Sequence, residues 1–495
     1  MADALEVVTI VGKRPVTSGL LTADDFYLEK INIITPKNIV NIKSVFVELS
    51  YYEDIFRGTV SGHVLISDSI SMIDRLGLSG NDFLELKFRK SKLVEEGQSI
   101  SKYFRIYRVG ERILNNSETE SYALNFCSEE LFLSEQTKVS KAYDGKTIEE
   151  IVTDILEKQM QIDERYLTIE STEGLYDFVI PYKKPFDAIN WLANYAIPTK
   201  SKTVKGADFV FFENSQGFNF RSLQSLFTNR TYNNYIYSQQ NLGNFKIETK
   251  VSNELGRSLR TIKSYTFLDT FDTLYGTVSG AFANRLITID PLTRRYTDTK
   301  FDYVSDYQNK LNDKEKNSLI NNTQNRLGKT ANQNYDAVLK VMTTNANQKT
   351  AVGILDKPHT VANDIRVEKY VPYRTAQLAL SHYVRIKLTI SGDPNLTVGT
   401  TINVELPSSR SNKDGSGLNE GITDQQYSGK YLITSVRHII SSQMKYETVL
   451  EVVSDGYKSS LFDFKDSKKL ADTVKGQSST FVQAPGEAGR PGFLG

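Results

Sequence analysis

The pentapeptide Gly-Thr-Val-Ser-Gly occurs twice in this chain, at residues 58–62 and again at residues 276–280. An aspartate stands four positions before the first glycine in both places, as Asp54 and as Asp272. A match of five residues is weak by itself, but here the surroundings agree as well. The repeat predicts that one structural unit is present twice in the chain.

A second pair of similar segments occurs in the same order. Tyr103–Val109, followed by a polar turn and a return strand ending at Cys127, resembles Tyr431–Val436 with its own return strand, Thr448–Val453. This pair lies further apart than the pentapeptides, so the second copy must contain extra sequence. The segment 304–370 includes a stretch rich in Asn and Gln that buries little apolar surface by itself, and we expect it to be the insertion.

Alternation of apolar and polar residues dominates from Tyr27 to Cys127 and again in the second copy, which is the period of half-buried strands. The 27 Tyr and 25 Phe residues also suit a strand-rich chain. Between the copies, apolar residues recur at helical spacing after Thr147 and after Pro185. The fold class predicted is mainly β with α+β inserts, built on two tube-like β-barrel domains of which the second is discontinuous.

Seven units follow from these patterns. They are an N-terminal arm (1–26), a first barrel (27–127), an α+β insert domain (128–243), the first part of the second barrel (244–303), a polar Asn/Gln-rich insert (304–370), the second part of that barrel (371–458) and a flexible C-terminal tail (459–495).

Local signals place several elements within these units. They predict an edge strand at Val7–Val11, a helix over 69–76 capped by Asp68, helices starting near Thr147 and Pro185, a hairpin around Glu213–Gln216 and a helix over Tyr373–Ser381.

Cysteine and histidine usage argues against metal chemistry. The single cysteine, Cys127, excludes an internal disulfide and lies in an alternating segment, where we expect a small buried strand residue. No two of the four histidines have the i, i+4 spacing of a helical ligand pair. These histidines are His63, His359, His382 and His438. We expect no metal ligands and no cofactor.

Catalytic signatures are missing as well. Ser61 stands one place too late in its pentapeptide to match the Gly-x-Ser-x-Gly nucleophile elbow, so its glycines are interpreted as a bulge or a close backbone approach. Glu129 and Glu130 are interpreted as solvated strand ends. The sequence contains no Walker-type phosphate loop and no His-Glu-x-x-His motif. We predict no catalytic residue and no enzymatic activity.

Charge and hydropathy exclude further classes of protein. The 60 basic and 59 acidic residues leave a formal charge of +1, which provides no general footprint for nucleic acid. The longest apolar stretches fall far short of the ~18–20 residues that span a bilayer. The first residues, Met1–Glu6, lack the basic and apolar regions of a secretory signal. We expect a soluble protein made in a cytoplasm, without a membrane span.

Four stretches in this order resemble the baseplate hub proteins of contractile-tailed bacteriophages and the hub part of type VI secretion spikes. They are Asp54 to Gly62 leading to Phe83–Leu86, Pro181–Leu192 with Phe212–Gly217, Asp272 to Asp290, and Tyr373–Leu380 with Gly392–Gly399 and Ser428–Tyr431. Together they cover most of residues 27–458. The resemblance is carried by their number and order, because none is a catalytic fingerprint.

This resemblance implies a structural role in the virion. Three chains with two barrels each would form a pseudo-hexameric ring that adapts a six-fold tail tube to a three-fold spike and lines the channel for DNA. The implied partners are two further copies, a trimeric central spike protein, a tail tube or tube-initiator protein and other baseplate wedge proteins, with assembly in the host cytoplasm and no specific binding of nucleic acid.

Two other functions compete with this hypothesis. A receptor- or carbohydrate-binding tail protein would need exposed aromatic platforms on loops, whereas most aromatic residues here alternate within expected strands. A peptidoglycan-cleaving tail enzyme would need a carboxylate pair or a metal site, for which the sequence offers no candidate.

Overall fold

The structure is a computed structural model. It describes residues 22–78, 80–90, 99–116, 118–199, 207–237, 254–270, 272–290, 294–306, 328–343, 367–380, 384–407, 424, 427–443 and 445–454. The strand predicted at Val7–Val11, much of the 304–370 insert and the tail 459–495 lie outside these residues. The described part is mainly β, as predicted, and it contains no helix long and apolar enough to cross a membrane.

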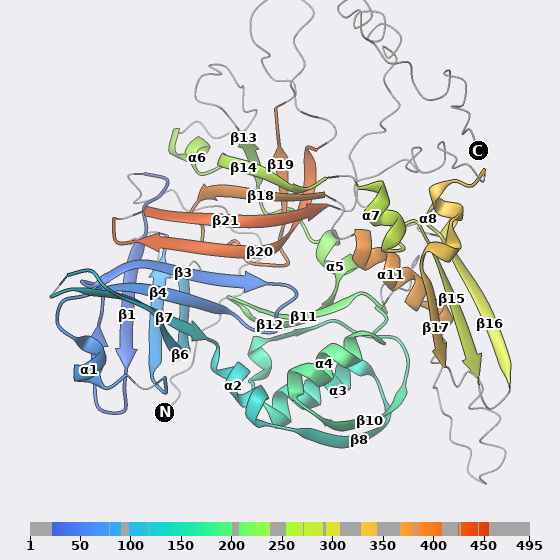
Figure 1. Cartoon of the computed structure of the whole chain (residues 1–495), viewed down its shortest axis with the longest axis horizontal. Coiled ribbons are helices and arrows are strands. Elements are labelled where there is room, and N and C mark those ends of the chain that lie inside the picture. Colours follow the sequence, from blue (N-terminus) through green and yellow to red (C-terminus); the bar gives the residue numbers. More distant parts are fainter. Residues whose placement is uncertain are drawn as a thin grey trace, which may run out of the picture.

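Thirteen strands form one continuous sheet (Figure 1). Its first half comprises β1 (Tyr27–Ile34), β2 (Ile39–Asn41), β3 (Phe46–Asp54), β4 (Ser61–Asp68), β5 (Phe83–Arg89), β6 (Ser99–Leu114) and β7 (Glu120–Cys127), with helix α1 (Met72–Leu76) between β4 and β5. Its second half comprises β13 (Asn234–Tyr237), β14 (Thr261–Asp269), β18 (Val384–Ser391), β19 (Thr401–Glu405), β20 (Gly429–Ser441) and β21 (Lys445–Ser454), with α6 (Glu254–Ser258) before β14.

Five strands of each half share one topology. The neighbour order β3-β4-β7-β6-β5 corresponds to β14-β18-β21-β20-β19, and every neighbouring pair in both series is antiparallel. The matching strands also follow one another in the same order along the chain. In that order, β3, β4, β5, β6 and β7 match β14, β18, β19, β20 and β21. The described topology therefore contains the same five-strand unit twice.

Irregularities in the strand pairing repeat as well. Two of them recur, at Phe46/Glu48 in β3 and Ile262/Ser264 in β14, and at Ile106/Arg108 in β6 and Ile433/Ser435 in β20. Two others, at Gly110/Ile113 in β6 and Phe267/Asp269 in β14, have no counterpart. A bulge inserts one residue at a fixed place in a ladder, so bulges at matching places fix the alignment of the two units. With this alignment, Ser61 of β4 corresponds to Arg385 of β18.

The two pentapeptides are consequently not equivalent, and this part of the prediction is wrong. The first leads into β4, which begins at Ser61, whereas the second lies in helix α7 (Thr273–Val278) and the turn after it. The backbone N–H of Tyr275 donates to Asp272 Oδ1 at 2.8 Å, which caps the start of that helix. The strand after Gly276 is β15, which belongs to a different sheet.

The six strands of the second half close on themselves. β19 pairs with β13 on one side and with β20 on the other, which completes the ring β19-β13-β14-β18-β21-β20. In the first half, no described pairing returns from β2 to β3, so a closed first barrel remains a prediction. The halves are joined by β20, because Gly429–Leu432 pair with β19 while Ser435–Ser441 pair with β3.

The insert domain follows β7 and has a core of its own, but Leu223, Leu226 and Phe227 near its end are buried in the core of the second half. Its elements are α2 (Glu129–Gln136), β8 (Val139–Lys146), α3 (Ile148–Asp154) with a π-helical turn (Ile155–Gln159), a 3-10 turn (Glu164–Tyr166), β9 (Leu167–Ile169), β10 (Tyr176–Lys183), α4 (Pro185–Ala193), β11 (Phe209–Asn214), β12 (Gly217–Ser222) and α5 (Leu223–Thr228). Thr147 and Glu150 form a capping box at α3, and Pro185 opens α4, so both predicted starts are confirmed.

A second, smaller sheet lies beside the second half, at the right in Figure 1. It pairs β15 (Ala283–Asp290) with β16 (Arg295–Asp302) and, in parallel, with β17 (Leu339–Thr343). The helices α8 (Tyr303–Asp306) and α11 (Val371–Leu380) and the 3-10 turns Ala331–Gln333, Tyr335–Ala337 and Val367–Lys369 accompany it. α11 confirms the helix predicted over Tyr373–Ser381. β17 lies within the polar insert and is a strand that the sequence did not predict.

Each half of the sheet contributes side chains to the core of the other half. Ile440 and Tyr446 belong to the β20–β21 hairpin, yet both are buried in the core of the first half. Ile55, which follows β3, is fully buried in the core of the second half. Because buried apolar side chains provide the main favourable term of folding, this exchange couples the stability of the two halves.

Candidate functional site: a buried junction and an open cleft

The loop between β3 and β4 lies where the first half, the second half and the insert domain meet. Gly62, at the end of the first pentapeptide, allows a close approach of neighbouring groups. A Cβ atom there would lie 2.3 Å from both Phe126 Cζ and the backbone oxygen of Ser50. The glycine is therefore required by packing, as the interpretation of the pentapeptide as a close backbone approach predicts.

Glu213 of β11 ties the insert domain to the first half. Its side chain is fully buried and accepts hydrogen bonds from Val60 N at 2.9 Å and from Ser128 Oγ at 2.6 Å. It also forms an ion pair with Lys102 Nζ on β6. A buried carboxylate is tolerated only when such partners replace its water shell, so these contacts fix the insert against the sheet.

Glu53 makes the corresponding link to the second half. Tyr51 Oη donates to one carboxyl oxygen at 3.0 Å, and Val398 N donates to the other at 3.0 Å. Burial raises the pKa of Glu53 to about 7, against the opposing effects of these hydrogen bonds and of Lys102. Glu53 thus titrates near neutrality at a contact between the two halves.

Neither glutamate was predicted from the sequence to be a buried contact. The sequence pattern placed Glu213 in a predicted turn, whereas the turn contains only Ser215 and Gln216 and Glu213 is inside the strand. The hairpin itself is confirmed, with β11 and β12 in antiparallel register. A carboxylate directly after the apolar run Phe209–Phe212 is the signal that would have identified Glu213 as a buried polar contact.

The residues considered for chemistry lie apart from one another. Cys127 is buried at the end of β7, and burial raises the pKa of its thiol to about 11, which disfavours the reactive thiolate. His438 is buried beside Tyr446 Oη at 2.9 Å, and burial lowers its pKa to about 3. Burial also lowers the pKa of His63. His359 and His382 lie outside the described residues.

The acidic and nucleophilic candidates show no catalytic geometry in the described part of the chain. Glu129 is exposed and pairs with Arg105 at 3.8 Å. Ser61 lies on the solvent face of β4, and Glu130 lies on the first turn of α2. No group of three potential metal ligands occurs among the described residues.

A shallow groove of about 410 Å³ crosses the seam between β3 and β20 on the solvent face of the sheet. Its lining mixes both charge signs, with Arg57, Lys387 and Arg437 beside Asp54 and Glu451. A surface of this kind lacks the one-signed basic footprint of a site that recognises nucleic acid.

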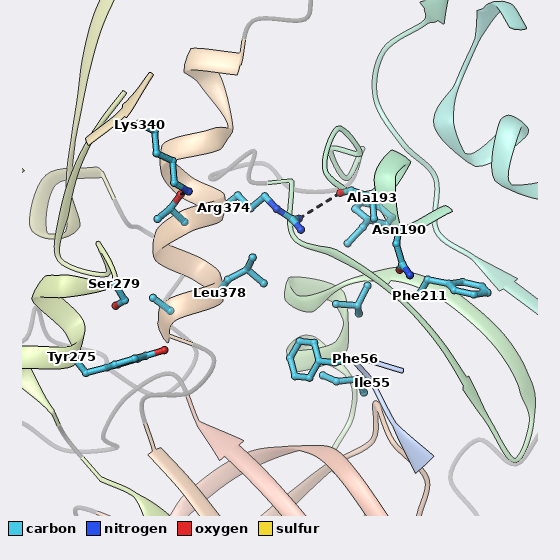
Figure 2. Close-up of a pocket in the computed structure, with 14 residues that line it drawn as sticks. Ile55, Phe56, Asn190, Ala193, Phe211, Tyr275, Ser279, Lys340, Arg374 and Leu378 are labelled. Carbon is cyan, nitrogen blue, oxygen red and sulfur yellow. Dashed lines mark hydrogen bonds between the residues drawn. The ribbon is translucent and has the colours of Figure 1, made fainter. Parts of the chain in front are cut away.

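A larger cleft of about 570 Å³ lies between the insert domain, the β3–β4 loop, α7, β17 and α11 (Figure 2). Arg374 extends across it and donates to the backbone oxygens of Ala193, at 3.4 Å, and Ala207. Lys340 reaches Thr375 Oγ1 at 2.7 Å on the same wall. Phe56 and Tyr275 also line the cleft.

The fold and these contacts describe a mainly β protein. It contains a duplicated five-strand unit and an insert that buried polar contacts hold against this unit. No family model matches the chain. The chain is similar to the probable baseplate hub protein gp334 of Vibrio phage KVP40, with 23% identity over 203 residues, which are 41% of this chain and 47% of that protein. The match thus spans about half the length of the relative, and it confirms the predicted resemblance to baseplate hub proteins.

Two tail proteins are among the solved structures that match the chain, both with TM-scores below 0.5. The tail protein from Neisseria meningitidis MC58 matches with a TM-score of 0.48 and 10% identity, over 87% of this chain and 97% of that one. The 43 kDa tail protein of prophage MuSo2 from Shewanella oneidensis matches with a TM-score of 0.44 and 9% identity, over 86% and 98% of the two chains.

Proposed function

We propose that this chain is a structural hub of a phage tail baseplate. The observation that carries the proposal is the sequence match to a probable baseplate hub protein. The duplicated five-strand unit supports it, because a chain that holds two similar units in one continuous sheet suits a ring built from repeated contacts. The role needs interfaces and a rigid frame, and no reaction.

The contact between the two units inside one chain provides a template for the contact between chains. Within the chain, β20 of the second unit pairs with β3 of the first, for example Ile439 with Ser50. The counterparts of these strands are β6 and β14. A ring of alternating units would therefore pair β6 of one copy with β14 of the next.

Both counterpart edges are open in the described part of the chain. Beyond Ile106, β6 pairs only with β7, and beyond Ile262, β14 pairs only with β18. The free end of β6 exposes Ile113 and Leu114, which are 61% and 71% accessible. Leu114 corresponds to Ile440, which is fully buried at the seam inside the chain. Exposed apolar edges of this kind favour pairing with another strand.

Transfer of the internal register to the second copy sets Ile113 opposite Thr266 and Leu114 opposite Tyr265. Three such contacts would close a homotrimer with pseudo-six-fold symmetry. In the baseplate this ring would adapt a six-fold tail tube, or a tube-initiator protein, to a trimeric central spike, contact wedge proteins and line the channel for DNA. The chain would then be a virion component assembled in the host cytoplasm.

Disulfide cross-linking tests the contact. The full chain with Cys127→Ser, Ile113→Cys and Thr266→Cys should form covalent dimers and trimers under oxidising conditions, because directly opposed residues of an antiparallel pair bring Cα atoms within disulfide range. Ile439→Cys with Ser50→Cys provides an internal control that cross-links within one chain. Ile113→Cys with Ile39→Cys, on a remote edge, should not form the ladder.

The number of chains joined decides between closure and other assemblies. A ladder that stops at three chains supports the trimer, and native mass spectrometry with co-expressed spike protein should then give the same stoichiometry. A ladder that continues beyond three chains indicates an open filament. A chain that stays monomeric at high concentration, with and without spike, contradicts the hub proposal.

A further inference from the structure

The cleft in Figure 2 combines positive charge with apolar walls. Among the described residues that line it, Lys340 and Arg374 are the cationic side chains and none is a carboxylate. Arg374 is fixed by the carbonyl oxygens of Ala193 and Ala207, and the charge of Asp208 lies on its buried side. Of these two cations, Lys340 is therefore the one that can bind a ligand.

Lys340 has no ion-pair partner among the described residues, since its ammonium is bound only by the hydroxyl of Thr375 at 2.7 Å. Burial and the neighbouring charge of Arg374 both lower the pKa of Lys340. A carboxylate placed in the cleft would relieve this repulsion and satisfy two further N–H groups of the ammonium.

Several large apolar side chains are exposed in the cleft and on helix α7. Phe56 and Tyr275 line the cleft and are 47% and 52% accessible. On α7, Leu274 and Val278 lie outside the cleft lining and are 74% and 66% accessible. Large apolar side chains exposed in a cleft and on the short helix beside it favour an interaction surface over an ordinary solvated face.

We propose that this cleft docks an extended segment of a partner chain in which an apolar side chain stands next to a carboxylate. The apolar side chain lies against Phe56 and Tyr275, and the carboxylate reaches Lys340. A volume of about 570 Å³, open to solvent, accepts a few side chains of such a segment. A free inorganic anion would leave the aromatic side uncovered, so charge alone does not describe the site.

A selection from a library of random dodecapeptides against the full chain tests this site. Enriched peptides should carry Asp or Glu within two residues of an aromatic or aliphatic side chain. Fluorescence anisotropy of the enriched peptides should then show at least tenfold weaker binding to Lys340→Glu and to Ser279→Trp, which fills the cleft. Lys37→Glu, an exposed lysine on another surface, is the matched control and should bind as the wild type.

Binding should also weaken as salt rises, because the carboxylate contact is screened. Lys340→Met removes the charge of the lysine but keeps a long side chain, so it separates the effect of lost charge from that of misfolding. Circular dichroism checks the fold of each variant. The proposal is overturned if no peptide is enriched over the Ser279→Trp chain, if enriched peptides lack carboxylates, or if Lys340→Glu binds them unchanged. It is also overturned if a synthetic peptide of residues 480–495 competes best, which identifies this chain's own segment as the occupant, or if Ser279→Trp changes the oligomeric mass, which identifies a second copy.

Discussion

Gly62 and Gly58 belong to the same pentapeptide but differ in what an added methyl group would meet. At Gly62 a Cβ lies 2.3 Å from a backbone oxygen and a phenylalanine ring, whereas at Gly58 the nearest contact is an ordinary 3.4 Å to Phe211. Gly62→Ala should therefore lower the free energy of unfolding by about 1–3 kcal/mol through overpacking. Gly58→Ala is the control, and denaturant unfolding followed by circular dichroism should find it near the wild type. Equal losses at both positions would contradict the packing argument.

Glu53 should impose a pH dependence of defined sign. Its folded-state pKa is about 7, above the ordinary value of 4.5, so between these values the folded chain holds a proton that the unfolded chain has lost. The stability it contributes is complete below pH 4.5 and is lost as the pH rises through 7, by about 3 kcal/mol. Glu53→Gln removes this titration, so its stability relative to the wild type should rise from pH 5 to pH 8.

Other buried groups titrate in the same range, and only the difference between variant and wild type isolates Glu53. Burial raises the pKa of Asp208 to about 7, which acts in the same direction. The lowered pKa of His438, about 3, acts in the opposite direction because the unfolded chain binds the proton below pH 6.5. Asp208→Asn should reproduce the sign found for Glu53→Gln. A flat difference for Glu53→Gln between pH 5 and 8 would show that Glu53 is ionised throughout.

At this scale, sequence identity was a poor guide to equivalence. The same Asp-x-x-x-Gly context turns the chain into β4 after Asp54, whose carboxylate accepts from Phe56 N, and into a helix after Asp272, whose carboxylate accepts from Tyr275 N. An aspartate can cap either geometry, so the rest of the fold decides between them. The buried roles of Glu53 and Glu213 depend on contacts with distant segments, which no local pattern contains.

Strand β20 contains a matched pair of residues for testing the coupling of the two halves. Ile440 is fully buried in the core of the first half, whereas its neighbour Ile439 points to the opposite, half-buried face. Ile440→Ala should cost about 2–5 kcal/mol through the cavity it leaves, while Ile439→Ala loses mainly strand propensity, ~1 kcal/mol or less. In thermal unfolding, the loss of stability caused by Ile440→Ala should lower the unfolding temperature of both halves. A loss confined to the second half would contradict the exchanged cores.

Elements with local signals were predicted well, and elements fixed by distant partners were not. The capping box at Thr147 and the proline at the start of α4 each involve only a few adjacent residues, and both helices begin at these signals. β17 lies in a polar region, and its strand form depends on parallel pairing with β15 across a long connection. Nothing in the sequence of residues 339–343 indicates that β15 is the partner strand.

For the whole molecule, the mainly β class and the presence of a duplicated unit were predicted from the sequence. The hairpins at Tyr103 and Tyr431 were the sound part of that inference, because their strands occupy matching places in the two units. The pentapeptide gave a wrong alignment, since the true counterpart of β4 is β18. The continuous sheet was not foreseen, because the pairing of β20 with β3 joins segments that share no local pattern.

The pairing of β20 with β3 also imposes an order of events during synthesis. Arg437 bonds Ser50 across 387 residues of sequence, and Ile440 and Tyr446 complete a core whose other members were translated long before. At ribosomal rates of about 5–20 residues per second, the first unit waits roughly 20–80 s for its last strands. During that time the nascent chain carries the bare edge of β3, which is a template for association with other chains. We therefore expect the yield of intact protein to depend on translation speed and on chaperones that cover this edge until the final hairpin emerges.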